Sequence, residues 1–290
     1  MDKDYTIDTL IEDIYATLTR DKPVDRDVVL KECEAFGERM SKMLANRLLE
    51  TRVPTVSMSQ VGQPCVTKLW SSVNEPEKGE PLTGDTLFKF LYGDMVEELT
   101  LSLSVIAGHP VEGTQDRMTL GTVSGSRDAV IDGCTVDVKS ASPYAFLKFK
   151  AGLTHDKDAF GYLTQLGLYT CAAKDDPLVT EKGVGYFLAV DKVSGKMHLD
   201  KHRMEDPEET EFSLLEMCAD RQAVVASSER PSPSIHPVPD GKSGNMKLDT
   251  VCSYCAFKKE CYPEVRTFLY SNGPRFLTRV VRTPDVFEVT

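Results

Sequence analysis

The stretch GSRDAVIDGCTVDVKSAS, residues 125–142, decides the fold because it sets charged residues into a pattern that is otherwise typical of two β-strands. The pair Asp132-Gly133 is a strong signal for a two-residue hairpin turn. With that turn, residue 131 pairs with 134, 130 with 135, 129 with 136 and 128 with 137. Asp128 then lies directly across from Asp137, and Lys139 emerges on the same face two residues later.

One face of this hairpin carries charge, and the other face is apolar. The apolar face consists of Ala129, Ile131, Val136 and Val138. Two opposed carboxylates repel each other, and a hard divalent cation such as Mg²⁺ or Mn²⁺ between them removes the repulsion. A neighbouring lysine can orient or activate a water molecule, or stabilise a developing oxyanion. The hairpin alone leaves an ordinary solvated face open as a second interpretation.

Composition places the chain among globular proteins. It has 290 residues, 41% hydrophobic and 27% charged, with a net charge of -11. This acidity argues mildly against nonspecific binding to nucleic acid, although a local basic groove or bound cations remain compatible with it. No apolar run approaches the length of a membrane span, and the acidic N-terminal segment does not resemble a signal peptide. We therefore expect a cytoplasmic protein, in a bacterial or phage-infected cell, without membrane contact.

Helical and strand-like segments alternate along the chain. Helical spacing covers 5–18, 26–49, 84–107, 158–174 and 207–227, and strands are expected at about 118–140 and twice within 183–204. This order predicts an α/β fold with a mixed central sheet flanked by helices. The expected divisions are an N-terminal helical segment (1–50), a core (51–226), a Pro/Ser/Gly-rich loop (227–250) and a cysteine module with a tail (251–290), all in one compact domain.

Three of the eight cysteines stand close together, at Cys252, Cys255 and Cys261. Three thiolates need a fourth ligand to complete a tetrahedral zinc site or a 4Fe-4S site, and Cys65 is the candidate. Such a clip would close a long loop and stabilise the fold. The remaining cysteines fall in apolar patterns typical of small buried residues, at positions 33, 134, 171 and 218.

The charged hairpin resembles the core of the PD-(D/E)XK nucleases, and most closely the RecB-type branch. The resemblance implies that Asp128 and Asp137 bind a catalytic Mg²⁺ or Mn²⁺ together with a backbone carbonyl, that of Val138, and that Lys139 is catalytic. Upstream, Gly93 followed four residues later by Glu97 resembles the family's helix with a further metal ligand. On a helical wheel Glu98 lies nearer the apolar stripe, so Glu98 remains the alternative to Glu97.

Two further motifs extend the resemblance. Gln165 and Tyr169 share one helix face and resemble the Gln-x₃-Tyr motif, which implies that they hold DNA against the metal site. One cysteine before the core and three after it resemble the iron–sulfur members, such as AddB-type and CRISPR-associated RecB-like exonucleases. That likeness implies a 4Fe-4S cluster, with zinc as the alternative, on Cys65, Cys252, Cys255 and Cys261.

The resemblance implies a metal-dependent DNA exonuclease that hydrolyses phosphodiester bonds of single-stranded or end-resected DNA, either alone as in phages or as a subunit of a larger machine. Recombination or single-strand-binding proteins are the expected partners besides DNA. The alternative is a scaffold that binds DNA ends with weak or no nuclease activity. A zinc-bound RNA-binding protein is a third interpretation, which needs the hairpin match to be coincidence. Cleavage polarity, strand preference, exonuclease against endonuclease action and oligomeric state stay open.

Overall fold

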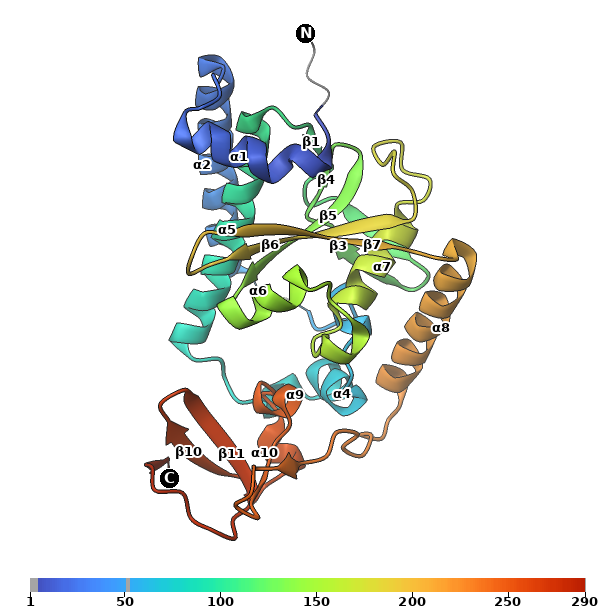
Figure 1. Ribbon diagram of the computed structural model, residues 1–290. Coiled ribbons are helices and arrows are strands. Elements are labelled where there is room, and N and C mark those ends of the chain that lie inside the picture. Colours follow the sequence, from blue (N-terminus) through green and yellow to red (C-terminus); the bar gives the residue numbers. More distant parts are fainter. Residues whose placement is uncertain (1–4, 51–52, 290) are drawn as a thin grey trace.

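The computed structural model describes residues 5–50 and 53–289, and a five-stranded mixed sheet forms its centre (Figure 1). The strand order is β1-β4-β5-β6-β7, in which β5 and β6 are parallel and the other pairs are antiparallel. The strands are β1 (Val111–Glu112), β4 (Ala129–Ile131), β5 (Cys134–Ala141), β6 (Val184–Asp191) and β7 (Met197–Arg203). A mixed sheet flanked by helices is the fold class that the sequence predicts.

The hairpin of β4 and β5 has the predicted register. Ala129 pairs with Val136 and Ile131 with Cys134, so Asp128 falls opposite Asp137 one step further along. Asp132 and Gly133 have φ values of 49° and 74°, and both lie in the left-handed region. Two successive left-handed residues define a type I′ turn, whose twist matches that of the strands it joins.

Helices cover both faces of the sheet. The face that carries Val136 and Val138 packs against α1 (Leu10–Thr19) and the C-terminal part of α5 (Gly84–Ala107). The opposite face, with Phe187 and Ala189, packs against α6 (Pro143–Lys150) and α7 (Tyr162–Ala172). Figure 1 shows these two helical layers on either side of the strands. The apolar face predicted for the hairpin is buried as expected.

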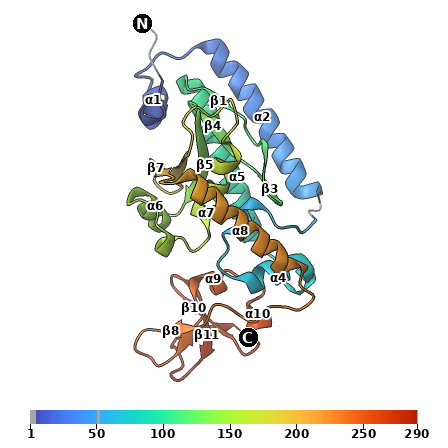
Figure 2. The ribbon, with the colours of Figure 1, turned by 90° about the vertical axis from the view of Figure 1, so that its right-hand side faces the viewer.

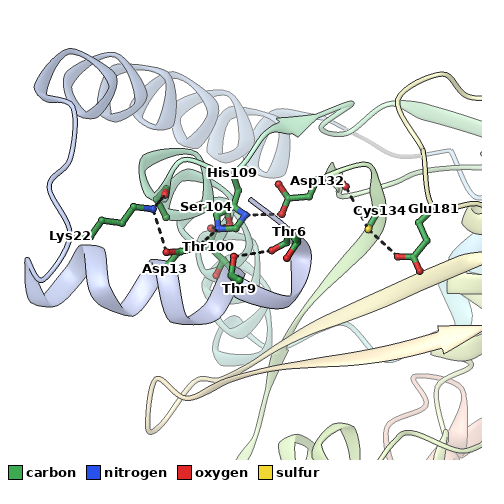
Figure 3. Close-up of polar contacts among 11 residues, drawn as sticks. Thr6, Thr9, Asp13, Lys22, Thr100, Ser104, His109, Asp132, Cys134 and Glu181 are labelled. Carbon is green, nitrogen blue, oxygen red and sulfur yellow. Dashed lines mark hydrogen bonds and ion pairs between the residues drawn. The ribbon is translucent and has the colours of Figure 1, made fainter. Parts of the chain in front are cut away.

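A buried polar network ties α1 to the hairpin turn (Figure 3). The ring of His109 lies 2.7 Å from Asp132 through Nδ1 and 3.4 Å from Asp13 of α1 through Nε2. Asp13 also lies 3.4 Å from the ammonium of Lys22, which follows α1. All of these groups but Lys22 are almost fully buried, so the network fixes the hairpin turn from outside the sheet.

Helix α2 (Arg26–Leu49) lies along α5 and contacts it through ion pairs (Figure 2). The guanidinium of Arg39 binds Glu98 at 2.7 Å, and that of Arg47 binds Asp94 at 2.8 Å. Asp25 caps the start of α2 by accepting hydrogen bonds from the backbone N–H groups of Asp27 and Val28.

A second layer of elements surrounds α7. Its core contains Met58, Leu69, Val123 and Leu168. The elements are α3 (Met58–Val61), α4 (Val66–Asn74), β2 (Arg117–Leu120), β3 (Val123–Ser126) and α8 (Pro207–Ala226). The described residues also contain three short 3-10 helices: η1 (Ile7–Thr9), which precedes α1, η2 (Pro76–Lys78) and η3 (His155–Lys157).

The C-terminal segment forms its own antiparallel sheet, with strand order β12-β10-β11-β9-β8. Its elements are β8 (Val238–Pro239), β9 (Met246–Lys247), α9 (Thr250–Ser253), α10 (Lys258–Cys261), β10 (Arg266–Tyr270), β11 (Gly273–Arg279) and β12 (Glu288–Val289). The sequence analysis did not predict this sheet, whose first strands lie within the stretch expected to be a loop. It lies at the end of the molecule opposite α1 (Figures 1 and 2).

None of the helices described combines the length and the apolar character that crossing a membrane requires.

Candidate functional site

Four charged side chains converge beside the hairpin of β4 and β5. Asp137 is 1% exposed, and its Oδ2 lies 2.5 Å from Nζ of Lys139. Its other oxygen, Oδ1, accepts a long hydrogen bond of 3.5 Å from Nε2 of Gln165 on α7. A parallel central strand therefore holds the acid and the lysine, and a helix on the same face brings the amide to them.

Asp128 is fixed by the strand that it faces. Its Oδ2 accepts a hydrogen bond of 2.7 Å from the backbone N–H of Val138. Burial and then the charge of Asp137 raise the pKa of Asp128 to about 7, because both disfavour the ionised form of the Asp128 carboxyl. The backbone of Val138 thus already positions one of the acids, while its carbonyl is the group that the sequence analysis expected at the metal.

Helix α5 contributes Glu97 to this group. Burial and the charges of Asp128 and Asp137 raise the pKa of Glu97 to about 9. Its Oε1 accepts a hydrogen bond of 2.7 Å from Nε2 of Gln115. Glu98, the alternative ligand, is instead paired with Arg39 of α2. The structure brings Glu97 to the hairpin acids and commits Glu98 to the contact between two helices.

Lys139 keeps its charge in this setting. Burial disfavours the ammonium, but Asp137 and Asp128 raise the pKa of Lys139 above its ordinary value. Its Nζ also lies 4.8 Å from the ring centroid of Tyr162, a cation–π distance. One permanent positive charge therefore stands among three carboxylates that cannot all ionise comfortably.

The charge balance of the group fits a divalent cation. Three acids share one ammonium, and their oxygen atoms are the ligands that Mg²⁺ and Mn²⁺ prefer. Within 5–50 and 53–289, however, no three histidine, cysteine or acidic side chains already form a group arranged to hold an ion. Asp137 is engaged by Lys139 and Glu97 by Gln115, so a cation would have to replace these contacts.

Tyr169 lies in the core behind Gln165. It is 3% exposed, and burial raises its pKa to about 12. Its hydroxyl lies against the backbone of Gly125, where a Cβ would come within 2.8 Å of the oxygen. Of the two residues expected to hold DNA, the structure brings Gln165 to the acids and packs Tyr169 between α7 and β3.

The four predicted cysteine ligands line one pocket, although they come from opposite ends of the core. Cys65 is the N-cap of α4, and the other three lie on or beside α9 and α10. Lys68, Ile235, Phe257 and Tyr262 complete much of the wall. The helices around these cysteines lie side by side between the core and the C-terminal sheet (Figures 1 and 2).

Hydrogen-bond donors point at the cysteine sulfurs. The backbone N–H of Lys68 lies 3.4 Å from Sγ of Cys65, and that of Phe257 lies 3.4 Å from Sγ of Cys255. Nη2 of Arg230 lies 3.3 Å from Sγ of Cys261. Burial, then the nearby cysteines, raise the pKa of Cys252 to about 12, so without a metal the thiol of Cys252 holds its proton.

Sequence reasoning missed several residues of both sites. Gln115 and Tyr162 contact the charged group, and no motif marks either of them. Arg230 lies in the stretch taken for a linker, yet that stretch runs along the cysteine pocket and is held by Thr67 and Trp70 of α4. Its Pro and Ser content is typical of surface loops and gave no sign of these contacts.

No protein-family model matches the chain, and no curated protein matches it. Two solved structures are similar in part. A crystal structure described as SSO0001 is 15% identical with a TM-score of 0.41, over 77% of this chain and 93% of that one. An alkaline exonuclease from Laribacter hongkongensis is 14% identical with a TM-score of 0.40, over 60% of this chain and 91% of that one. At these TM-scores neither likeness assigns a function to this chain.

Proposed function

We propose that the chain is a metal-dependent DNA exonuclease of the RecB-like PD-(D/E)XK type. The observation that supports it most is the convergence of Glu97, Asp128, Asp137 and Lys139 from a helix and a hairpin. The raised pKa values of Glu97, about 9, and of Asp128, about 7, are the mark of carboxylates gathered for a cation rather than of a solvated face.

A divalent cation held by Glu97, Asp128 and Asp137, with the carbonyl of Val138, would lower the pKa of a bound water and offset charge on the phosphate. Lys139 supplies a fixed positive charge beside Asp137 for the attacking water or the developing oxyanion. Gln165 orients Asp137 through its amide. The backbone N–H of Val138 keeps Asp128 turned toward the same place.

The cysteine pocket is proposed to hold a 4Fe-4S cluster. Four sulfurs from two distant segments line it, but they are not grouped as ligands of a single ion. N–H groups aimed at sulfur atoms are a usual way of tuning such clusters, and Cys65, Cys255 and Cys261 each have such a donor. Its part would be to hold α4 against the C-terminal module, with zinc as the alternative occupant.

A scaffold that binds DNA ends without cutting them is the second candidate. The observation that favours it is the ion pair at 2.5 Å between Lys139 and Asp137, which occupies a predicted metal ligand. If a cation cannot displace this ammonium, the site would bind DNA and leave it intact.

The adjacent glutamates of α5 provide a matched test. We expect Glu97→Gln to slow cleavage of end-labelled linear DNA with Mg²⁺ or Mn²⁺ by at least about 100-fold, since it removes a proposed metal ligand. Glu98→Gln should keep the cleavage rate and lower the stability instead, because it weakens the contact to Arg39. Equal activity of wild type and Glu97→Gln would contradict the metal site. Binding of DNA ends without cleavage by wild type would favour the scaffold.

A further inference from the structure

We propose that Phe160 and Tyr254 form a stacking track for the unpaired bases of single-stranded DNA, and that Tyr162, which packs on the core ring of Phe149, connects this track to the carboxylates. This inference rests on the proposed nuclease function and names the form of its substrate. The centroids of Phe160 and Tyr254 lie 6.2 Å apart, and those of Phe160 and Tyr162 lie 5.7 Å apart. The ammonium of Lys139 stands over the ring of Tyr162, so the series ends at the charged site.

The outer two rings are unusually open to solvent. Tyr254 is 74% exposed and Phe160 is 46% exposed, although they come from segments far apart in sequence and contact each other. Both line a small pocket together with Gln63, Pro64 and Lys68. Large aromatic side chains exposed together in this way mark a binding surface rather than a packing need.

The backbone presents Phe160 rigidly. The carboxylate of Asp158 accepts hydrogen bonds from the backbone N–H groups of Phe160, Gly161 and Leu163, at 3.3, 2.9 and 2.8 Å. Gly161 has a φ of 78° and packs against Gly62, so closely that a Cβ on residue 161 would lie 2.3 Å from the carbonyl oxygen of Gly62. A backbone that is held before the ligand arrives loses little freedom on binding.

Nucleobases are the occupant that this surface favours. Every base has a π-face that stacks on an aromatic ring whatever its identity, and Lys68 adds a positive charge for the phosphate backbone. In a duplex the base faces are already stacked on one another, so only a single strand can stack its bases on the two exposed rings. The direction of the track, toward Lys139 and Asp137, places the backbone of such a strand at the proposed metal site.

The first test is equilibrium binding of a labelled oligothymidylate to the full chain, with chelator present so that no strand is cut. Phe160→Ala and Tyr254→Ala should each weaken binding by about fivefold or more, the usual worth of one stacked base. Phe160→Trp should keep the wild-type affinity for oligothymidylate, because it keeps an aromatic ring at this position. Phe212→Ala, which removes a 58% exposed ring from α8, should bind as wild type does.

An abasic strand of the same length separates stacking from a structural effect. Wild type should bind it more weakly than Phe160→Ala binds oligothymidylate, because every ring loses its base, and Phe160→Ala should bind the abasic strand about as wild type does. If Phe160→Ala lost the same affinity for the abasic strand as for oligothymidylate, the ring would act only through the fold. That result would overturn the track. Wild-type affinity in both alanine variants, with cleavage by wild type intact, overturns the track and leaves the nuclease proposal standing. Wild type that neither binds nor cuts DNA overturns both.

Discussion

The carboxylate site and the cysteine pocket differ in how far each is held together by its own residues. In the carboxylate site every acid has a protein partner: Lys139 for Asp137, the Val138 backbone for Asp128 and Gln115 for Glu97. In the cysteine pocket, N–H donors reach the sulfurs of Cys65, Cys255 and Cys261, and all four cysteines line a pocket between separate elements. The first site should keep its shape without a ligand, and the second should depend on one.

From this difference we expect separate tasks for the two proposed sites. A preorganised acid group can lose its cation and recover it without refolding, as a reaction centre needs. A pocket whose ligands come from the two ends of the core contributes its binding energy to folding instead. Substitutions in the first should change chemistry, and substitutions in the second should change stability.

The largest expected effect tests whether the carboxylate site acts in cleavage rather than in stability. Asp137→Asn should reduce DNA cleavage at least about 1000-fold, because it removes a proposed metal ligand, while Asn keeps the shape of the side chain and the pairing of β5 with β4 and β6 holds the fold. Asp200→Asn is the matched control, a 5% exposed acid of β7 that binds the Leu153 backbone. It should lower the unfolding midpoint in urea and keep the cleavage rate. If Asp137→Asn lowered the unfolding midpoint and kept the cleavage rate, Asp137 would have a structural role.

The next effect concerns the cysteine pocket. Cys255→Ser should remove most bound iron and lower the unfolding temperature, while cleavage by the remaining folded protein drops less than about tenfold. Cys218→Ser changes a buried cysteine of α8 that does not line the pocket. This variant should keep the iron. Iron content, the visible spectrum and thermal unfolding would be measured after anaerobic purification. If the pocket held zinc in place of iron, Cys255→Ser should lose the zinc and the same stability.

The raised carboxylate pKa values predict an unusual pH dependence for the metal-free protein. Glu97 and Asp128 bind protons more tightly folded than unfolded, so stability is fully present below about pH 4 for these groups and falls as the pH rises through about 7 and about 9. Denaturation in urea with chelator at pH 5, 7 and 9 measures the free energy of unfolding, which should decrease in that order.

Metal binding should follow the opposite trend over the same range. Between pH 7 and pH 9 binding displaces the proton of Glu97, so the apparent affinity for Mg²⁺ should rise about tenfold per pH unit. Glu97→Gln should flatten both dependences. A metal affinity independent of pH would show that the cation binds elsewhere.

The smallest effect tests the support of the hairpin. Asp132→Ala leaves His109 without its 2.7 Å partner and should reduce the free energy of unfolding by about 1–3 kcal/mol, with little change in cleavage. Asp175→Ala, an exposed acid, should change it by less than about 0.5 kcal/mol. A large loss of activity in Asp132→Ala would mean that the turn also positions Asp128.

The sequence could predict what depends on local pattern. The Asp132-Gly133 turn determines the register of β4 and β5, and that register determines which side chains face Asp137. Helical spacing gave α2 and α5 at their observed bounds. The wheel of α5 could not choose between Glu97 and Glu98, because the deciding partner, Arg39, lies 59 residues away from Glu98.

The C-terminal sheet was missed despite a local signal. The dipeptide Asn272-Gly273 is a hairpin signal between two strand-like runs, and in the structure Ser271 and Asn272 form the loop, because Tyr270 of β10 pairs with Gly273 of β11. The short strands β8, β9 and β12 have two residues each and no pattern of their own, so only tertiary pairing defines them. The same is true of Gln115 and Arg230, whose roles come from contacts across the fold.

The central place of β5 has a consequence for amide hydrogen exchange. This strand is paired on both sides, with β4 and β6, and is buried along most of its length. Its backbone N–H groups can therefore reach solvent chiefly through global unfolding, whereas the two-residue strands at the edges of the C-terminal sheet can open alone. Asp137 and Val138 should be among the slowest amides to exchange, so the residues proposed for chemistry lie in the part of the chain that opens least often.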